Sequence, residues 1–358
     1  MTAKSIEDIR LWLLWVNNMM KIKISFVALL TCLSLFLATN SFAGTDAAAF
    51  LKKSVGAKAI AMGGAFTSIA DDPTAIYWNP AGLSLIQMYS VSAMGSSGAS
   101  DKYPGLKDVI PTHNFFAVTV PLAKFTDLLG KTVVGVGYIS SKMSNIQHTK
   151  DDGTRLGSIT DTDSAYYLAA GVPIWEAATS LYVGGTIKYI TKEMSEVGVS
   201  DGGIDFDIGV IYSIDTLNFG AVLQKGVNIG DDSAPMITKV GASNNFKIGD
   251  KFRILPAIDL VQRQKEPLSL NFGAEFGMER IVELDSFAID GIYLRGGIEG
   301  YAIENRYDIK EDINENVGYN FGLGLNFMIF NTYLQLDLAI CSGNLFEEST
   351  KFTVNFYF

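Results

Sequence analysis

The sequence predicts a transmembrane β-barrel of about fourteen antiparallel strands. Over most of the chain, apolar residues recur at every second position. The 358 residues are 48% hydrophobic and their mean hydropathy is +0.22. Yet the one sustained apolar run, Phe26 to Ala38, is shorter than the roughly 18 residues that a membrane-spanning helix needs. A β-barrel explains both observations, because it distributes its apolar residues over alternate positions of many strands.

Three segments show the alternation most clearly: Ile204 to Tyr212, Leu270 to Met278 and Tyr319 to Ile329. Their length of nine to eleven residues matches a tilted strand that crosses a membrane. A soluble β-sandwich also alternates, but its strands usually have about five or six residues. The polar positions here are mostly Gly, Asn and Ser, whereas a solvated sheet would present more charged residues and Thr. The pattern therefore favours the barrel over the sandwich.

The number of strands and the lengths of their connections support the same architecture. Segments with this pattern are centred near residues 90, 117, 137, 168, 186, 208, 220, 240, 257, 274, 293, 324, 335 and 354. Long connections, such as 141–163 and 300–318, alternate with short ones, such as 249–250 and 330–331. Outer-membrane barrels have an even number of strands, with short turns at one end and longer loops at the other. The terminal Phe358 resembles the assembly signal of such barrels.

The start of the chain has the organisation of a signal peptide. Lys21 and Lys23 precede an apolar stretch, and Ser41-Phe42-Ala43 supplies small residues for cleavage. We expect residues 1–43 to be removed; residues 1–18 are either a mis-assigned extension of the start or part of a long n-region. Removing their four basic and two acidic residues would change the net charge from −10 to −12. Nucleic-acid binders carry a basic footprint, so this charge argues against nucleic acid as a partner.

Residues 44–85 differ from the rest and are expected to form a small plug, or hatch, and residues 86–358 the barrel. The stretch from Ser54 to Ser84, SVGAKAIAMGGAFTSIADDPTAIYWNPAGLS, resembles the N-terminal signature of the PorV/PorQ family. The matching positions are Gly56-Ala57, Ala61 to Ala65, Ala70-Asp71-Asp72 and Trp78 to Leu83. That family belongs to the FadL-like group of fourteen-stranded barrels, and the resemblance implies an N-terminal hatch inside the barrel.

Six residues of this segment are candidates for a structural or ligand-gating role. Gly63 and Gly64 allow a backbone to pass close to a barrel wall. Asn79-Pro80 favours a turn, because Asn bonds its own backbone and Pro presets φ. Asp71 and Asp72 can accept hydrogen bonds from loop amides or pair with lumen-facing Lys188 or Arg295. The alternative is that these residues shape a folded plug and bind nothing.

No constellation in the sequence predicts an enzyme or a cofactor. The two histidines, His113 and His148, have no evident Ser, Cys or Asp partner for nucleophilic catalysis. Cys32 lies in the expected signal segment, which leaves Cys341 as the single mature cysteine. No Cys/His spacing indicates a metal site. Four loop carboxylates could bind calcium but match no EF-hand, and a solvated acidic loop is favoured: Asp151, Asp152, Asp161 and Asp163.

Three functions in the outer membrane remain open. In the first, which the resemblance to PorV implies, the barrel docks exported proteins or a secretion channel of the type IX kind. In the second, it is a FadL-like passive channel for hydrophobic small molecules. In the third, it has a structural or porin-like role. Expected partners are outer-membrane lipid and, depending on the function, secretion-machinery or cargo proteins or a hydrophobic small molecule.

Overall fold

The computed structural model describes the barrel and most of the residues that precede it. The described residues are 49–98, 110–125, 130–150, 153–195, 199–226, 228–229, 232–233, 236–264, 266–284, 286–302, 317–330, 332–342 and 349–358. The expected signal peptide, residues 1–43, and the first five residues of the expected hatch lie outside this set.

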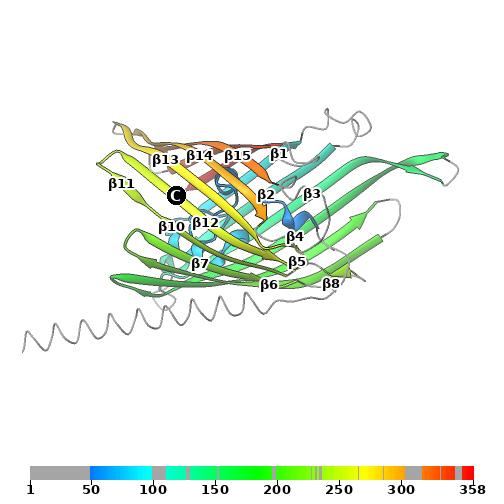
Figure 1. Cartoon of the computed structure of the whole chain (residues 1–358), viewed down its shortest axis with the longest axis horizontal. Coiled ribbons are helices and arrows are strands. Elements are labelled where there is room, and N and C mark those ends of the chain that lie inside the picture. The colour runs from blue at the N-terminus through cyan, green and yellow to red at the C-terminus, as the bar shows by residue number, and fades with distance from the viewer. Residues whose placement is uncertain are drawn as a thin grey trace, which may run out of the picture. The chain divides into compact units, whose positions relative to one another are not determined.

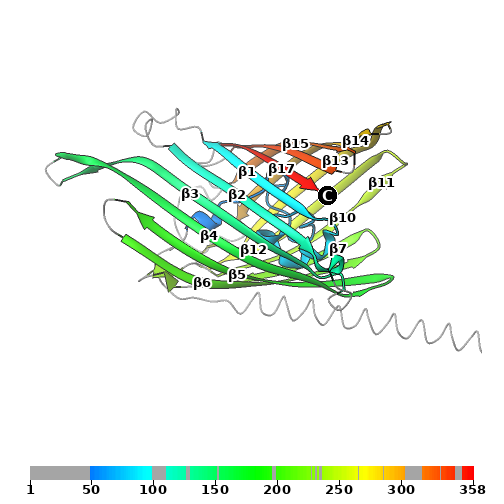
Figure 2. The same cartoon turned by 180° about the vertical axis from the view of Figure 1, so that it is seen from behind.

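The described residues form a closed barrel of fourteen antiparallel strands, as the sequence predicts (Figures 1 and 2). The strands are β1 (Ser90–Gly98), β2 (Ile110–Pro121), β3 (Val133–Thr149), β4 (Arg155–Glu176), β5 (Thr179–Met194), β6 (Val199–Ile214), β7 (Leu217–Gln224), β10 (Ile237–Asn244), β12 (Phe252–Arg263), β13 (Ser269–Leu284), β14 (Phe287–Ala302), β15 (Gly318–Ile329), β16 (Thr332–Ser342) and β17 (Ser349–Tyr357). Short β11 (Phe246–Ile248) extends β10, and β8 (Asn228–Ile229) pairs only with β9 (Asp232–Ser233).

Each strand pairs with its neighbours in the chain, and the first strand closes the ring by pairing with the last. In the β1–β17 ladder Ser90 lies opposite Tyr357 and Gly98 opposite Ser349. The β10–β12 ladder completes the wall on the other side. Within the part of the wall that these ladders close, no strand has a free edge, and closure satisfies the backbone hydrogen bonds that lipid cannot.

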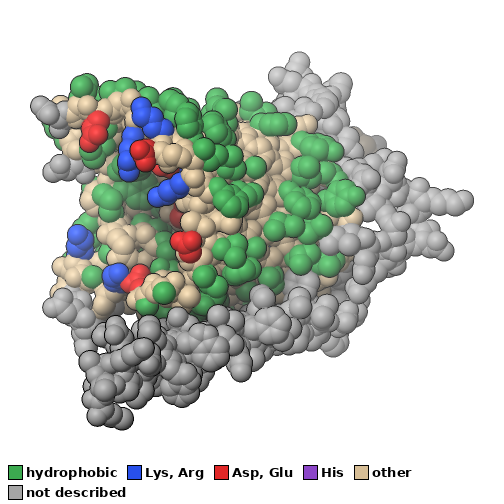
Figure 3. Space-filling view, turned by 60° about the vertical axis from the view of Figure 1, so that its left-hand side comes forward, with side chains coloured by type: hydrophobic (Ala, Val, Ile, Leu, Met, Phe, Trp, Pro, Cys, Tyr) green, Lys and Arg blue, Asp and Glu red, His purple; other side chains and the backbone are tan. Residues whose placement is uncertain are grey.

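The outer face of the barrel is apolar, and its alternation is the one read from the sequence. On β15, Tyr319, Phe321 and Leu323 are each at least half exposed. Their neighbours Asn320 and Gly322 point inward, where Asn320 is 3% exposed. On β17, Phe352, Phe356 and the terminal Phe358 also point outward. Figure 3 shows hydrophobic side chains over the outer surface. An apolar exterior over polar inward positions is the pattern of a barrel that faces lipid.

The two ends of the barrel carry connections of different length. At one end two residues join β6 to β7, β13 to β14 and β15 to β16. At the opposite end 11 residues separate β1 from β2 and 15 separate β14 from β15. We call these the short-turn end and the long-loop end. Figure 3 shows charged side chains gathered around a hollow near the short-turn end.

The residues before β1 fold inside the barrel as short helices. They are η1 (Ala49–Lys52), α2 (Ala57–Ala61), α3 (Ala75–Trp78) and η2 (Pro80–Leu85); η5 (Leu122–Lys124) follows β2. From Val55 to Ser84 every residue except Asp71 is buried. We call residues 49–85 the hatch. Among the described residues, no helix is both long and apolar enough to cross a membrane.

Candidate functional site: the hatch and the wall around it

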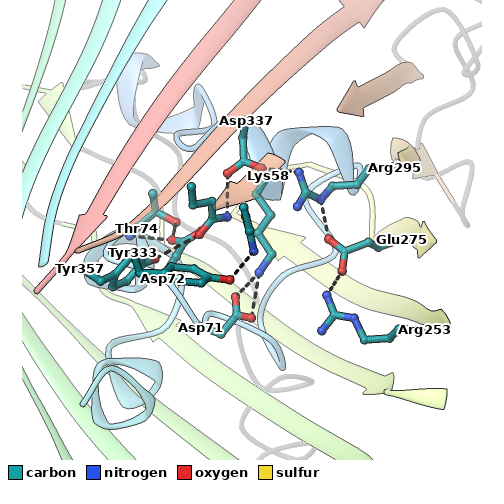
Figure 4. A network of polar contacts seen from close by, with 12 residues as sticks. Lys58, Asp71, Asp72, Thr74, Arg253, Glu275, Arg295, Tyr333, Asp337 and Tyr357 are labelled. Atoms are coloured by element: carbon teal, nitrogen blue, oxygen red, sulfur yellow. Dashed lines mark hydrogen bonds and ion pairs between the residues drawn. The ribbon is translucent and has the colours of Figure 1, made fainter. Parts of the chain in front are cut away.

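The inward face of the barrel carries a network of charges that neutralise one another. Glu275 on β13 lies directly opposite Arg295 on β14, and their side chains pair at 2.6 Å. Arg295 also pairs with Asp337 of β16 at 2.5 Å, and Arg253 of β12 pairs with Glu275 (Figure 4). Arg253 also contacts the carboxylate of Glu279 at 3.3 Å. We call Arg253, Glu275, Arg295 and Asp337 the wall network.

Most of the wall network is buried, so the stability of the barrel depends on each of these charges having a partner. Glu275 and Asp337 are each 1% exposed, and Arg295 is 5% exposed. Gln335 donates to the second oxygen of Asp337 at 2.7 Å. Buried charges are tolerated when they are paired and hydrogen-bonded, whereas removing one partner leaves a costly isolated charge. The network therefore ties β12, β13, β14 and β16 together on the inward side of the wall.

A second inward ion-pair cluster lies on β5 and β6. The ammonium of Lys188 is 2.9 Å from the Asp205 carboxylate and 2.8 Å from that of Asp207. Lys188 faces Asp205 directly in the ladder of these two strands. All three side chains are nearly fully buried. The adjacent strand, and not the hatch, thus provides the partners of Lys188.

The hatch is hydrogen-bonded to several strands of the wall. Asp259 of β12 uses one carboxylate oxygen to accept from the amides of Phe66 and Thr67, each at 3.0 Å. Ser68 and Ser243 of β10 pair through their hydroxyls at 2.9 Å. Three further contacts join Gln224 to Tyr77, Thr186 to Ile76 and Ala57 to Thr353. Anchors on β5, β7, β10, β12 and β17 hold the hatch from several sides.

Asn79 and Pro80 form the turn that carries the hatch from α3 into η2. Asn79 has extended backbone angles, and its side-chain oxygen accepts from the amide of Ala81 at 3.2 Å. Its side-chain amide donates to the carbonyl of Thr67 at 2.8 Å and to that of Val210 on β6 at 3.1 Å. Pro80 occupies the first position of η2, where its missing N–H costs nothing. Asn79 therefore closes the turn and also fixes it to the wall.

Gly63 and Gly64 bring the hatch backbone into contact with β13 and β14. Both have positive φ, 64° and 70°, which side chains rarely adopt. A β-carbon on Gly63 would lie 2.5 Å from the backbone nitrogen of Ile298. On the wall side, a β-carbon on Gly297 would overlap the Gly63 backbone. The close approach needs glycine on both sides.

Asp71 and Asp72 have different surroundings although they are adjacent. Asp71 accepts from the ammonium of Lys58 with both oxygens, at 2.7 and 2.8 Å, and its side chain is 37% exposed. Asp72 is 2% exposed and accepts from the amide and the hydroxyl of Thr74, at 2.8 and 2.5 Å (Figure 4). Burial raises the pKa of Asp72 to about 6, an increase that Asp71 reinforces and that Lys58 and Thr74 oppose. Asp72 is the group of the hatch that titrates near neutral pH.

The partners of Asp71 and Asp72 differ in part from those expected from the sequence. We expected hydrogen bonds from loop amides, or ion pairs with Lys188 or Arg295. Asp72 accepts from a loop amide, but neither residue pairs with Lys188 or Arg295. Lys188 and Arg295 already pair with carboxylates of other strands, and neither forms an ion pair with a carboxylate of the hatch. Asp71 instead uses Lys58, a residue of the hatch itself.

The rest of the hatch is apolar, and it packs against an apolar part of the wall. Trp78 is 2% exposed, and its ring nitrogen donates to the carbonyl of Val55 at 2.8 Å. Phe66 packs edge-on against Trp78. Buried inward-facing side chains of β2 to β6 join the same core: Phe115, Ile139, Tyr167, Ile190 and Ile211. The inward face of β2–β6 therefore combines this apolar core with the Lys188–Asp205–Asp207 cluster, whereas the wall network lies on β12–β16.

Other residues considered in the sequence do not assemble into a site. Among the described residues, no three potential metal ligands come together. Asp161 and Asp163 lie on β4, while Asp151 and Asp152 fall outside the described residues. Cys341 is half-buried on β16. His113, on β2, is 3% exposed, and its ring nitrogens have no hydrogen-bond partner among the described residues.

The architecture defines a class: an outer-membrane-type β-barrel of fourteen strands with an internal plug. No family model and no curated protein matches the sequence. The fold matches a FadL homologue of Pseudomonas aeruginosa, with 9% identity, 88% of this chain and 99% of that chain covered, and a TM-score of 0.51. It matches the Ralstonia pickettii toluene transporter TbuX with 13% identity, coverage of 85% and 97%, and a TM-score of 0.52.

The Pseudomonas putida toluene transporter TodX gives a similar result, with 11% identity, coverage of 85% and 97%, and a TM-score of 0.50. At these identities the likeness concerns the fold. The chain accordingly has a FadL-like barrel, which is an outer-membrane protein fold.

Proposed function

We propose that the protein is a passive outer-membrane channel for hydrophobic small molecules. The observation that carries this proposal is the hatch: it lies inside a FadL-like barrel and packs its apolar residues against inward apolar residues of β2–β6, such as Phe115, Ile139 and Ile211. A buried apolar interface inside a barrel offers a path to an apolar solute, whereas a polar solute would lose its hydration there. The named neighbours TbuX and TodX are toluene transporters, and their fold supports the same class of permeant.

Solute uptake tests the proposal. Outer membranes that contain the protein should take up a monoaromatic hydrocarbon or a long-chain amphiphile faster than membranes that lack it. Uptake of a small hydrophilic solute should be unchanged, because the hatch occupies the lumen. Equal rates for the hydrophobic solutes with and without the protein would contradict the proposal.

A second candidate is the docking of exported proteins, and one feature of β3 and β4 favours it. Beyond Ser144, β3 has no partner on β2, and before Asp161, β4 has no ladder partner on β5. Residues 146–149 and 155–159 thus form a two-stranded ribbon at the long-loop end whose outer edges no described strand covers. Free edges can receive a strand of a partner.

Removal of the ribbon distinguishes the two functions. Docking predicts that large exported proteins co-purify with the wild type under gentle extraction, and that a variant with a shortened ribbon loses them. A channel predicts unchanged solute uptake in the same variant. Purification of the protein without any such partner would contradict docking.

A further inference from the structure

The lipid-facing surface of the barrel contains a groove that the proposed channel does not use. It has a volume of about 700 Å³ and lies over neighbouring strands from β7 to β15, which face the viewer in Figure 1. Its outward-facing lining is almost entirely apolar: Leu217, Ala242, Asn244, Pro256, Ile258, Phe272, Ala274, Gly296, Ile298, Tyr319 and Phe321.

Strand register explains why the wall is hollowed here. Pro256, Ala274 and Gly296 are cross-strand partners and form one row of small residues on the outer surface. The adjacent row consists of bulky partners, Ile258 opposite Phe272 and Phe272 opposite Ile298. A row of small side chains next to a row of large ones produces a groove that runs across the strands.

The groove runs obliquely from one end of the barrel toward the other. It begins at Asn244, the last residue of β10, beside Leu217, the first residue of β7, near the short-turn end. It finishes at Tyr319 and Phe321, near the start of β15 at the long-loop end. Five strand-to-strand steps of about 4.8 Å give a length of roughly 24 Å along the row. An extended apolar chain fits this shape.

The groove is closed toward the lumen. Gly273 and Gly297 alternate with its floor residues and face inward, where they meet the backbone of Met62 and Gly63. The hatch therefore backs the floor of the groove. An occupant must come from the lipid phase, and its binding does not depend on transport through the barrel.

One end of this apolar groove is polar and incomplete. The side-chain oxygen of Asn244 is buried and has no hydrogen-bond partner among the described residues, and the same holds for the neighbouring Asn245. A buried acceptor without a hydrogen bond is unfavourable. The last side-chain torsion of Asn is soft, so the amide of Asn244 can turn toward a donor in the groove. The groove therefore fits a molecule that has an apolar chain along its length and an N–H donor at the short-turn end.

We propose that this groove binds a phospholipid with a primary-amine headgroup. One acyl chain lies along the row Pro256, Ala274 and Gly296, and the headgroup ammonium donates to the oxygen of Asn244. An ammonium has three donors and no acceptor, which matches an orphan amide oxygen. A fatty acid would present a carboxylate acceptor to that oxygen, and a quaternary amine would present no N–H at all. Neither completes the site.

Two lipid-facing glycines provide a matched pair of variants. A β-carbon on Gly296 would meet nothing nearer than 3.9 Å, so the wall accepts a side chain here, and we expect Gly296→Leu to extend into the groove. Gly185 of β5 also faces outward, with its nearest contact at 3.7 Å, and lies outside the groove. Gly185→Leu is therefore the control. Asn244→Leu removes the acceptor and keeps the size of the side chain.

The experiment is native mass spectrometry of the full-length detergent-extracted protein, with phosphatidylethanolamine and phosphatidylcholine of identical chains. We expect the wild type and Gly185→Leu to retain one phosphatidylethanolamine with a preference of about tenfold, the ratio that 1.4 kcal/mol gives. Asn244→Leu should bind both lipids equally, and Gly296→Leu should bind neither. Equal retention by Gly296→Leu and wild type, or no headgroup preference in the wild type, would overturn the proposal. So would a dimer that Gly296→Leu dissociates, because the groove would then belong to a second copy.

Discussion

At the scale of single residues, the pair Lys58–Asp71 is asymmetric. The side chain of Lys58 is 9% exposed, whereas that of Asp71 is 37% exposed. Burial alone would lower the pKa of Lys58, but the Asp71 carboxylate raises it above its ordinary value. Loss of either partner leaves the other charge behind, and the two residual charges have unequal access to water.

We predict that Asp71→Asn destabilises the protein more than Lys58→Met. Asp71→Asn leaves the buried ammonium of Lys58 without its paired carboxylate, which costs about 3–5 kcal/mol. Lys58→Met leaves the carboxylate of Asp71, which water can reach, and costs roughly 1 kcal/mol. Urea unfolding in detergent measures both, and the double variant should recover part of the loss. Equal destabilisation by the two single changes would contradict this account.

A second residue-scale prediction concerns pH. Burial raises the pKa of Asp72 in the folded protein to about 6, above its ordinary value of 3.8. The folded protein therefore binds the proton more tightly than the unfolded chain. The free energy of unfolding should rise as pH falls through 6 toward 4, and this gain is lost again as pH rises through 6. Two pKa units correspond to about 3 kcal/mol.

Asp72→Asn keeps an oxygen that can accept from Thr74 and removes the titrating proton. The slope of stability against pH between 4 and 6 should therefore be smaller in Asp72→Asn than in the wild type. The measurement is the urea midpoint at several pH values. An unchanged slope would show that another group is responsible.

Sequence reasoning located the hatch residues but not their partners. The motif drew attention to Asp71, Asp72 and Asn79, because acids and Asn-Pro pairs are conspicuous between apolar segments. Lys58 was missed, since a lysine in an Ala-rich stretch carries no distinctive pattern. The pairs Lys188–Asp205 and Glu275–Arg295 are direct cross-strand partners. They could have been found by aligning the strands, once the register was known.

At the scale of elements, the strands were predictable and the wall contacts of the hatch were not. Every expected strand centre falls within an observed strand, because a barrel must place an apolar residue outward at every second position. The hatch has no such periodicity, since it is buried on all sides. Its packing depends on where wall glycines leave room, and this emerges only when distant strands come together.

The adjacent glycines of β14 give an element-scale prediction. Gly297 faces the hatch and Gly296 faces lipid. Gly297→Ala should destabilise the protein by at least about 1–3 kcal/mol, the usual cost of overpacking, because the new methyl overlaps the Gly63 backbone. Gly296→Ala should change stability little. Thermal unfolding of the two variants checks this, and similar Tm values would argue against close contact between hatch and wall.

At the scale of the whole molecule, the filled lumen predicts low conductance. From Val55 to Ser84, Asp71 alone is exposed, and hydrogen bonds join the hatch to at least six strands, β5, β6, β7, β10, β12 and β17. In planar bilayers the wild type should show no steady ohmic current, which separates a plugged channel from the porin-like alternative. A stable, open-channel conductance in the wild type would favour the porin.

If hydrophobic solutes pass along the interface between hatch and wall, as we propose, then tying the hatch to the wall should block them. The hydroxyls of Ser68 in the hatch and Ser243 in β10 are 2.9 Å apart, so cysteines at both positions are placed to form a disulfide. The direct measurement is uptake of a hydrophobic solute by the double variant Ser68→Cys, Ser243→Cys, with Cys341→Ala to prevent mispairing. Uptake should stop under oxidation and return on reduction, while each single cysteine variant stays insensitive to redox. Undiminished uptake by the fully oxidised double variant would contradict the claim.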